Sequence, residues 1–346
     1  MIKTLIVDDS KLVRSIIKDF LESDGTFQII GEAENGKDGA KLAEELNPDL
    51  ITMDIEMPVM NGLQAIAEIK KFMTTAIVVI TTHDTAKMAY EATVKGAMEF
   101  YAKDIFTSNM SPQQRDEILN TLKHITGIKR RVPVRHDKAK ETIIVPRRLN
   151  SVVIAASTGG PKALSQLCAN LPGDFPVPIT LVQHNTTGFD LGFAQWLDGY
   201  TPLHVCLAQE RTIPTKGNFY VAPTDRHLVL SEKGFSFDDG APINNQKPAA
   251  DMLFKSASEY YGESLVSVVL TGMGSDGAEG TRYVKKAGGI TIAQDEATSM
   301  IYGMPQAAAE TGCVDLVLPL EHIAQKLVSL TNPVNFANLV KGADKT

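Results

Sequence analysis

Carboxylate side chains follow two short apolar runs in the N-terminal part of the chain. Asp8 and Asp9 come directly after residues 5–7 (LIV), and Asp54 comes after residues 50–53 (LITM). Such runs are typical of buried parallel strands, and ligands of open α/β sheets bind at the carboxyl ends of the strands. The three acids are therefore expected to meet at one edge of a sheet. They would repel one another there unless a hard cation such as Mg2+ lay among them.

Two further strand ends supply a hydroxyl and an ammonium group. Thr81 follows the apolar run 77–80, and Lys103 follows the run 99–102. Carboxylates, a metal ion, a hydroxyl and an ammonium in one crevice predict a phosphoryl-transfer site. For any single acid the alternative is a helix cap after a strand, but that alternative does not explain all five positions together.

With these five positions in order, the N-terminal segment up to Lys103 resembles the receiver domain of two-component response regulators. The resemblance implies a flavodoxin-like five-stranded parallel sheet and implies that Asp54 accepts a phosphoryl group from a histidine kinase. It also implies that Asp8 and Asp9, together with Asp54, hold Mg2+. Thr81 and Lys103 would then be the switch residues that sense the phosphoryl oxygens.

A serine in the second half of the chain lies where a nucleophile could be exposed. Residues 151–156 (SVVIAA) predict a strand, and Ser157 begins the turn 157–160 (STGG) that leads into a helix from Pro161 to about Leu171. The glycines allow a sharp turn, and the free amides of the helix start can bind an anion. A nucleophilic hydroxyl needs this exposure and a place for an oxyanion; a plain N-terminal cap is the alternative.

A histidine and an aspartate follow two more predicted strands of the same segment. His184 comes after residues 178–183, and Asp276 lies in the turn after residues 264–270. Ser157, His184 and Asp276 can thus meet at one sheet edge, where His184 would take the serine proton and Asp276 would fix the imidazole tautomer. The other histidines occupy less suggestive positions: His83, His124, His136, His204, His227 and His322.

A glycine-rich string offers a competing interpretation of this turn. Residues 272–277 (GMGSDG) match the dinucleotide-binding pattern G-x-G-x-x-G, and Asp295 ends the next strand near the distance expected for a ribose-binding acid. Against a nicotinamide dehydrogenase, the string lies late in its domain and its aspartate would repel phosphates. That alternative also leaves Ser157 and His184 unexplained.

Matches to one known pattern occur in three strings, residues 156–161, 183–184 and 271–280, and further at Ala222, Pro223, Asp225, His227, Asp251, Leu253, Phe254 and 303–305. Together they resemble the catalytic domain of the CheB family of chemotaxis protein-glutamate methylesterases. The resemblance implies a triad of Ser157, His184 and Asp276. It also implies that the Met273 backbone amide, with Thr158 beside the serine, stabilises the oxyanion.

The function that this resemblance implies is a phosphorylation-activated protein-glutamate methylesterase. It would demethylate glutamate γ-methyl esters on methyl-accepting chemotaxis receptors and deamidate receptor glutamines, with a chemotaxis histidine kinase as phosphodonor and no cofactor for the ester hydrolysis. A non-catalytic, phospho-dependent binding protein is the alternative. Departures from the family patterns are Asp104 after the receiver lysine, Ala156 before the serine, and Asn185 and Thr186 after the histidine.

Length and composition predict two α/β domains. The chain has 346 residues, a length that exceeds what one hydrophobic core usually organises. Of these residues 43% are hydrophobic and 22% charged, which is typical of globular proteins. The alternation of strands and helices after residue 149 predicts a doubly wound, mostly parallel sheet. We expect a receiver domain at 1–127, a basic linker at 128–148 and a methylesterase domain at 149–340.

The remaining features exclude several classes of protein. The basic stretch could be a nucleic-acid arm, but acidic domains flank it and no helix-turn-helix pattern follows, so no nucleic-acid partner is expected. The cysteines, Cys168, Cys206 and Cys313, are odd in number and widely spaced, which predicts neither disulfides nor zinc. No run is long enough to span a membrane. We expect a cytoplasmic monomer without direct membrane insertion.

Overall fold

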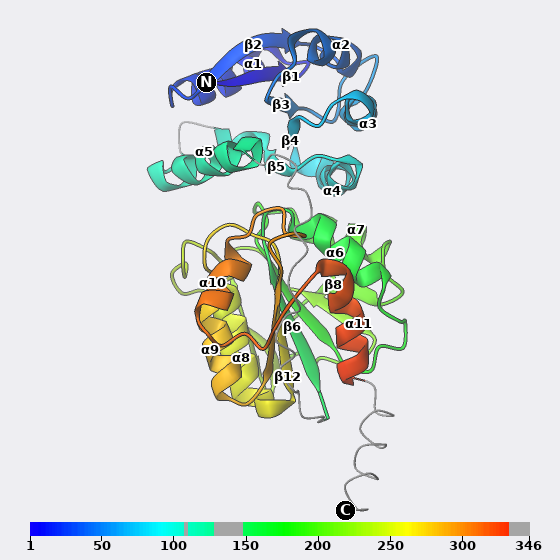
Figure 1. Ribbon diagram of the computed structural model, residues 1–346, viewed down its shortest axis with the longest axis vertical. Coiled ribbons are helices and arrows are strands. Elements are labelled where there is room, and N and C mark those ends of the chain that lie inside the picture. The colour runs from blue at the N-terminus through cyan, green and yellow to red at the C-terminus, as the bar shows by residue number, and fades with distance from the viewer. Residues whose placement is uncertain (107–109, 128–147, 332–346) are drawn as a thin grey trace, which may run out of the picture. The chain divides into compact units, whose positions relative to one another are not determined.

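The computed structural model describes residues 1–106, 110–127 and 148–331 (Figure 1). The chain divides into two compact units, residues 1–131 and 132–346. The predicted linker at 128–148 lies outside the described residues except for Arg148, as does the predicted domain end at 340. The exact domain boundaries therefore stay predictions.

The first unit is a five-stranded sheet in the order β2-β1-β3-β4-β5, with every strand pair parallel. Two of its inner strands, residues 50–53 and 76–81, are buried at every position, as is typical of parallel strands covered by helices on both faces. The strands are β1 (Ile2–Val7), β2 (Phe27–Ala33), β3 (Leu50–Met53), β4 (Ala76–Thr81) and β5 (Glu99–Ala102). The helices are α1 (Lys11–Glu22), α2 (Gly36–Leu46), α3 (Gly62–Phe72), α4 (Ala86–Lys95) and α5 (Pro112–Gly127), with short 3-10 turns at His83–Thr85 and Lys103–Phe106.

Strand register brings the acidic residues of this unit together. Val7 of β1 pairs with Met53 of β3, so the residues that follow them, Asp8 and Asp54, leave neighbouring strands at the same edge. The loop after Asp54 is tight: a Cβ on Gly62 would lie 2.0 Å from the Asp54 carbonyl oxygen. Only glycine therefore fits where α3 begins.

The second unit is a seven-stranded sheet in the order β14-β13-β12-β6-β7-β9-β8, again with parallel pairs. Helices α8, α9 and α10 cover one face and α6, α7 and α11 the other (Figure 1). The strands are β6 (Ser151–Ala156), β7 (Ile179–Gln183), β8 (His204–Leu207), β9 (Asn218–Val221), β12 (Leu265–Val269), β13 (Ile290–Gln294) and β14 (Leu316–Leu318), with a separate antiparallel hairpin of β10 (His227–Ser231) and β11 (Gly234–Asp238). The helices are α6 (Gly160–Ala169), α7 (Asp190–Asp198), α8 (Ala250–Tyr261), α9 (Ala278–Lys286), α10 (Met304–Glu310) and α11 (Leu320–Thr331), with a 3-10 turn at Gly262–Ser264.

The strand order reverses beside β6, which is the usual place for a ligand site in such folds. From β6 the sheet continues through β7 in one direction and through β12 in the other. Ala156 at the end of β6 pairs with Gln183 at the end of β7, and Ala155 pairs with Val269 at the end of β12. The three loops that follow these strands therefore converge. The predicted α/β fold class is confirmed in both units.

The helices of the described residues leave no candidate for a membrane span, since none combines the length and the apolar character that crossing a bilayer requires.

Candidate functional site

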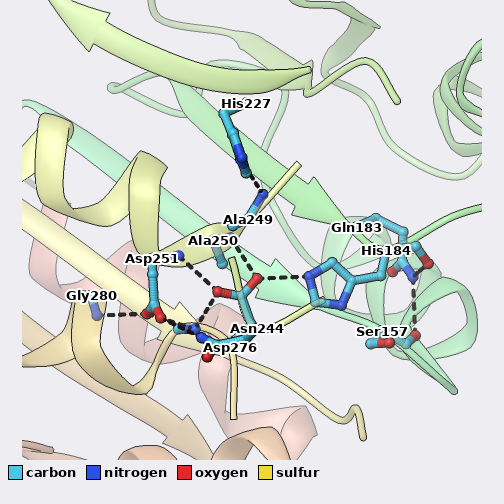
Figure 2. Close-up of polar contacts among 11 residues, drawn as sticks. Ser157, Gln183, His184, His227, Asn244, Ala249, Ala250, Asp251, Asp276 and Gly280 are labelled. Atoms are coloured by element: carbon cyan, nitrogen blue, oxygen red, sulfur yellow. Dashed lines mark hydrogen bonds and ion pairs between the residues drawn. The ribbon is translucent and has the colours of Figure 1, made fainter. Parts of the chain in front are cut away.

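The loops after β6, β7 and β12 bring Ser157, His184 and Asp276 together. The Nε2 atom of His184 lies 2.8 Å from Oδ2 of Asp276, and the imidazole lies between that carboxylate and Ser157 (Figure 2). The backbone joins the same loops, because His184 N donates to the Ala156 carbonyl at 3.0 Å and Ser157 N donates to the Thr271 carbonyl at 3.0 Å. The three side chains predicted as a triad are thus neighbours.

Hydrogen bonding assigns the tautomer of His184. An ionised carboxylate only accepts, so Nε2 carries the proton that goes to Asp276. The Nδ1 atom is buried and has no hydrogen-bond partner among the described residues. In a neutral imidazole it is the proton acceptor, which is what a serine hydroxyl requires. The two ring nitrogens have exchanged the roles they have in chymotrypsin-like triads, where Nδ1 faces the aspartate.

Asp276 is held by backbone amides as well as by the histidine. Its Oδ2 atom also accepts from Ala250 N at 2.6 Å, and its Oδ1 atom accepts from Asp251 N and Gly277 N, both at 3.0 Å. Burial by itself raises the pKa of Asp276, but His184 and these amides outweigh it and lower the pKa below its ordinary value. The carboxylate is therefore ionised and fixed in orientation.

The loop that begins at Thr271 lies against the serine. A Cβ on Gly272 would lie 2.7 Å from the Cβ of Ser157, so Met273 lies on a loop that tolerates no side chain at position 272. The Thr271 hydroxyl donates to the Thr158 carbonyl at 3.0 Å and accepts from Ile301 N at 3.0 Å. The two backbone segments predicted to bind an oxyanion, at Thr158 and Met273, are thus tied together.

Gln183 holds the turn that contains Ser157. Its Nε2 atom donates to the carbonyls of Ser157 at 3.0 Å and His184 at 2.9 Å. A Cβ on Gly160 would lie 2.1 Å from the Gln183 side-chain oxygen. Two residues next to the predicted triad depart from the family pattern, Ala156 and Asn185. Ala156 is fully buried. Both polar atoms of the Asn185 side chain are buried and have no hydrogen-bond partner among the described residues.

Two residues of this site were not assigned a role from the sequence. His227 is fully buried, accepts from Ala249 N at 3.1 Å through Nδ1, and donates through Nε2 to the Ala241 carbonyl at 3.0 Å. Asp251 is buried in the first turn of α8 beside Asp276 (Figure 2). Both belong to strings that matched the family pattern, and that match was the available signal. The hydrogen bonds that join the starts of α8 and α9 could not be predicted from the sequence.

The structure gives a reason to reject the dinucleotide interpretation of 272–277. A bound pyrophosphate would need free amides at the start of α9. Instead, Gly277 N and Gly280 N donate to Oδ1 of Asp251 at 2.9 and 2.7 Å. An anion already occupies this helix N-terminus, and it is a side chain of the protein.

In the first unit, Asp8, Asp9 and Asp54 form a compact acidic cluster. One carboxylate oxygen from each lies within 4.8 Å of the others. Lys103 Nζ lies 2.8 Å from Asp8 Oδ2 and 2.7 Å from Asp54 Oδ2. Burial and the charge of Asp54 raise the pKa of Asp8, although Lys103 opposes them. One ammonium facing several oxygen donors leaves a negative site that suits a hard divalent cation.

Lys103 is kept charged by the same contacts. Burial works against its positive charge, but the hydrogen bonds with Asp54 and Asp8 prevail and raise the pKa of Lys103. Arg14 holds the backbone of the cluster in place, since its buried guanidinium donates to the Asp8 carbonyl at 2.8 Å. Nothing in the sequence distinguishes Arg14, whose position on a helix resembles that of many surface arginines.

Thr81 and Asp104 lie at the margin of this cluster. The Thr81 hydroxyl is hydrogen-bonded to the Thr85 hydroxyl at 2.7 Å rather than to Asp54. The Asp104 carboxylate lies 3.0 Å from Nε2 of His83. This exposed contact joins the segments that follow Thr81 and Lys103.

Comparison with known proteins gives the family. The family model "CheB methylesterase" matches residues 152–327, and the model "Response regulator receiver domain" matches residues 4–112. The chain belongs to the CheB methylesterase family.

Relatives of this family match both units of the chain. A protein-glutamate methylesterase/protein-glutamine glutaminase of Pyrococcus horikoshii is 39% identical over 342 residues, which cover 94% of this chain and 93% of the relative. The protein of the same name from Thermotoga maritima is 36% identical over 339 residues, covering 95% and 98%. The crystal structure of the Thermotoga maritima CheB methylesterase catalytic domain superposes with a TM-score of 0.52 and 40% identity, covering 53% of this chain and all of that one. The CheB resemblance seen in the sequence is confirmed.

Proposed function

We propose that this CheB family member is a phosphorylation-activated hydrolase of glutamate γ-methyl esters on chemotaxis receptors, and that it also deamidates receptor glutamines. The observation that carries the proposal is the His184 imidazole, which donates to Asp276 through Nε2, while its buried Nδ1 atom has no hydrogen-bond partner among the residues that the structure describes. That arrangement prepares a base for the neighbouring Ser157 hydroxyl.

The reaction follows from these positions. The Ser157 oxygen attacks the ester carbonyl while Nδ1 of His184 takes the hydroxyl proton, and Asp276 stabilises the imidazolium through Nε2. The same proton then passes to the leaving methoxide, which departs as methanol and leaves a glutamyl ester on Ser157. Water next attacks this acyl-enzyme, again with His184 as base, and free glutamate and the serine hydroxyl are released. A glutamine side chain follows the same route with ammonia as the leaving group.

The tetrahedral intermediates need donors for their negative oxygen. We assign this role to the backbone amides of Met273 and Thr158, because the Thr271 hydroxyl fixes their two segments relative to each other. No metal or organic cofactor is part of this proposed ester chemistry.

In the receiver unit we propose Asp54 as the phosphoryl acceptor and a chemotaxis histidine kinase as the donor. Its carboxylate oxygen bonds to phosphorus as the phosphorus–nitrogen bond of a phosphohistidine breaks. Asp8, Asp9 and Asp54 would hold Mg2+, which when bound would offset the negative charge gathered there. Lys103 already pairs with Asp54 and would pair with the new phosphoryl oxygens, while Thr81 would leave Thr85 to reach them.

Methanol release from methylated receptor membranes tests the proposal. The full chain should release methanol slowly alone and faster with acetyl phosphate and Mg2+. A non-catalytic binding protein would bind phosphoryl groups but release no methanol under either condition. The receptors that serve as substrates are those of the source organism.

A further inference from the structure

Asp251 caps a helix other than its own. It lies in the first turn of α8, and its Oδ1 atom accepts from Gly277 N at 2.9 Å and Gly280 N at 2.7 Å at the start of α9. Its Oδ2 atom accepts from the side-chain amide of Asn244 at 2.9 Å. One carboxylate thus joins α8, α9 and the turn that contains Asn244.

Asp276 makes the reverse connection. It lies just before α9 and accepts from Ala250 N and Asp251 N, the first amides of α8, at 2.6 and 3.0 Å. The residues at the helix starts, Ala249 and Gly277, have no side-chain cap of their own. Each helix is therefore capped by the carboxylate that belongs to the other segment (Figure 2).

The two helices are in direct contact beside this exchange. A Cβ on Gly280 would lie 2.6 Å from the Cβ of Phe254 and 3.1 Å from the Cα of Asp251. Because the two helices touch here, the bonds from Gly277 N and Gly280 N to Asp251 help set the position of the α8 amides relative to Gly277. Those amides in turn set the orientation of the Asp276 carboxylate.

The exchange places two acids side by side, and this has an electrostatic cost. Burial and the charge of Asp276 raise the pKa of Asp251 to about 6. A serine or asparagine would cap α9 without that cost. Helix capping alone is therefore a poor explanation for a carboxylate here. A carboxylate that accepts from two backbone amides of the α9 start and from the Asn244 side-chain amide accounts for all these contacts of Asp251.

We propose that Asp251 is a positioning residue of the hydrolytic site, which holds Asp276 in the orientation that its bond to His184 Nε2 requires. The inference rests on the proposed esterase function. Asp276 uses Oδ2 for both Ala250 N and His184, so a shift of α8 against α9 rotates the carboxylate and weakens the His184 bond. Small displacements of this kind can cost about 100-fold in rate.

Steady-state methanol release by the full chain tests the inference with three variants. Asp251→Ala should lower kcat by roughly 10- to 100-fold with KM unchanged, because receptor docking does not involve this buried group. Asp251→Asn keeps an acceptor for the two α9 amides and should recover most of kcat. Asp315→Asn is the matched control: it removes a largely buried acid that accepts from Thr291 N at 3.0 Å beside the start of β13, away from the triad edge, and should leave kcat unchanged.

Two further measurements make the outcome decisive. In proton NMR, the hydrogen-bonded proton on His184 Nε2 should give a downfield resonance that is absent in His184→Gln. This resonance should lose intensity or move upfield in Asp251→Ala. Fluorescence of Trp196, the only tryptophan of the chain, shows whether the second unit is folded. A folded Asp251→Ala variant with wild-type kcat and an unchanged resonance would overturn the inference, as would an equal loss of kcat in Asp315→Asn.

The design also covers failure at an earlier step. If Asp251→Ala does not fold, Asn244→Ala takes its place, since it removes only the partner of Oδ2; a several-fold loss of kcat at constant KM is expected, and unchanged kcat would refute the role. If the wild-type protein releases no methanol, the proposed function fails, yet the His184 resonance in the same variants still decides whether Asp251 orients Asp276.

Discussion

His184 and Asp276 are joined by a hydrogen bond of 2.8 Å that leaves Nδ1 of the imidazole buried and unpartnered within the described part of the chain. Ser157 lies on that free side (Figure 2). Because only one nitrogen can carry the proton of a neutral imidazole, the bond to Asp276 leaves Nδ1 as the nitrogen that can accept a proton. Two predictions depend on this arrangement.

Replacing the nucleophile should abolish turnover without disturbing the fold. Ser157→Ala is expected to lower kcat for methanol release by about 10⁴-fold, because the triad acts as a unit. His184→Ala should give a similar loss. Trp196 fluorescence should show an unchanged unfolding midpoint for the second unit. A Ser157→Ala variant that releases methanol at the wild-type rate would contradict the mechanism.

Asp276→Asn should be nearly as severe, by a different route. An amide nitrogen facing Nε2 would favour the tautomer with the proton on Nδ1, which cannot accept the serine proton, and a loss of about 10³- to 10⁴-fold is expected. The variant also loses charge that the first amides of α8 favour. Comparison with Ser157→Ala under identical conditions checks the prediction, and an Asp276→Asn enzyme of normal rate would require another acid for His184.

The sequence predicted the triad because all three residues follow buried strands. Strand ends are visible as the end of an apolar run, and strand order then brings Ser157, His184 and Asp276 to one edge. The strands predicted at 151–156 and 178–183 differ from β6 and β7 by at most one residue, and the helix expected from Pro161 begins one residue earlier and ends at Ala169.

What the sequence could not predict depends on contacts between distant loops. The exchange of carboxylates between Asp251 and Asp276 joins residues 25 positions apart, and nothing in local composition distinguishes Asp251 from an ordinary acid in a first helical turn. The burial of His227 likewise follows from packing of the β10 hairpin against the start of α8. Such residues become identifiable only when the helix starts are placed in space.

Receiver chemistry should depend on Asp54 and respond through Lys103. Asp54→Asn should abolish activation of methanol release by acetyl phosphate with Mg2+ while leaving basal activity. Lys103→Ala should retain the acceptor and weaken activation, since the ammonium that now pairs with Asp54 and Asp8 would pair with the phosphoryl charge. Typical couplings of about 5- to 150-fold set the scale of activation.

Chelation provides the control for that experiment. EDTA should prevent activation by acetyl phosphate in the wild type and leave the basal rate unchanged, because the proposed ester hydrolysis uses no metal. A basal rate that falls with EDTA would contradict the separation of the two sites. Activation that survives in Asp54→Asn would point to a different acceptor.

Nicotinamide dinucleotide should not bind the glycine-rich turn. Its amides at Gly277 and Gly280 already bind Asp251, and a ligand raises thermal stability only if it binds the folded state. Millimolar NAD is therefore expected to leave the Trp196 unfolding midpoint unchanged. A saturable increase would revive the dehydrogenase alternative.

The pH dependence of stability should reveal the electrostatic cost at Asp251. Its pKa is raised to about 6 in the folded protein by burial and by Asp276, from an ordinary value of 3.8. As pH rises from about 4 to 6 the unfolded chain loses this proton before the folded one does, so the acid's contribution to the free energy of unfolding falls across that window and is constant above it. The loss should be on the order of 2–3 kcal/mol.

Asp251→Asn removes this titration and isolates its effect. The other ionisable groups facing the site, Asp276, Glu279, His184 and His227, are present in both proteins, so the difference in unfolding free energy between wild type and variant should decrease from pH 4 to pH 6 and then level off. Urea unfolding followed by Trp196 fluorescence measures it in the full chain. Asp276, whose pKa is lowered, has the opposite effect on the free energy of unfolding. It stabilises the folded protein above about pH 4, and that stabilisation disappears as pH falls. A difference for Asp251→Asn that grows with pH would mean that the amides of α9 outweigh burial and the neighbouring charge.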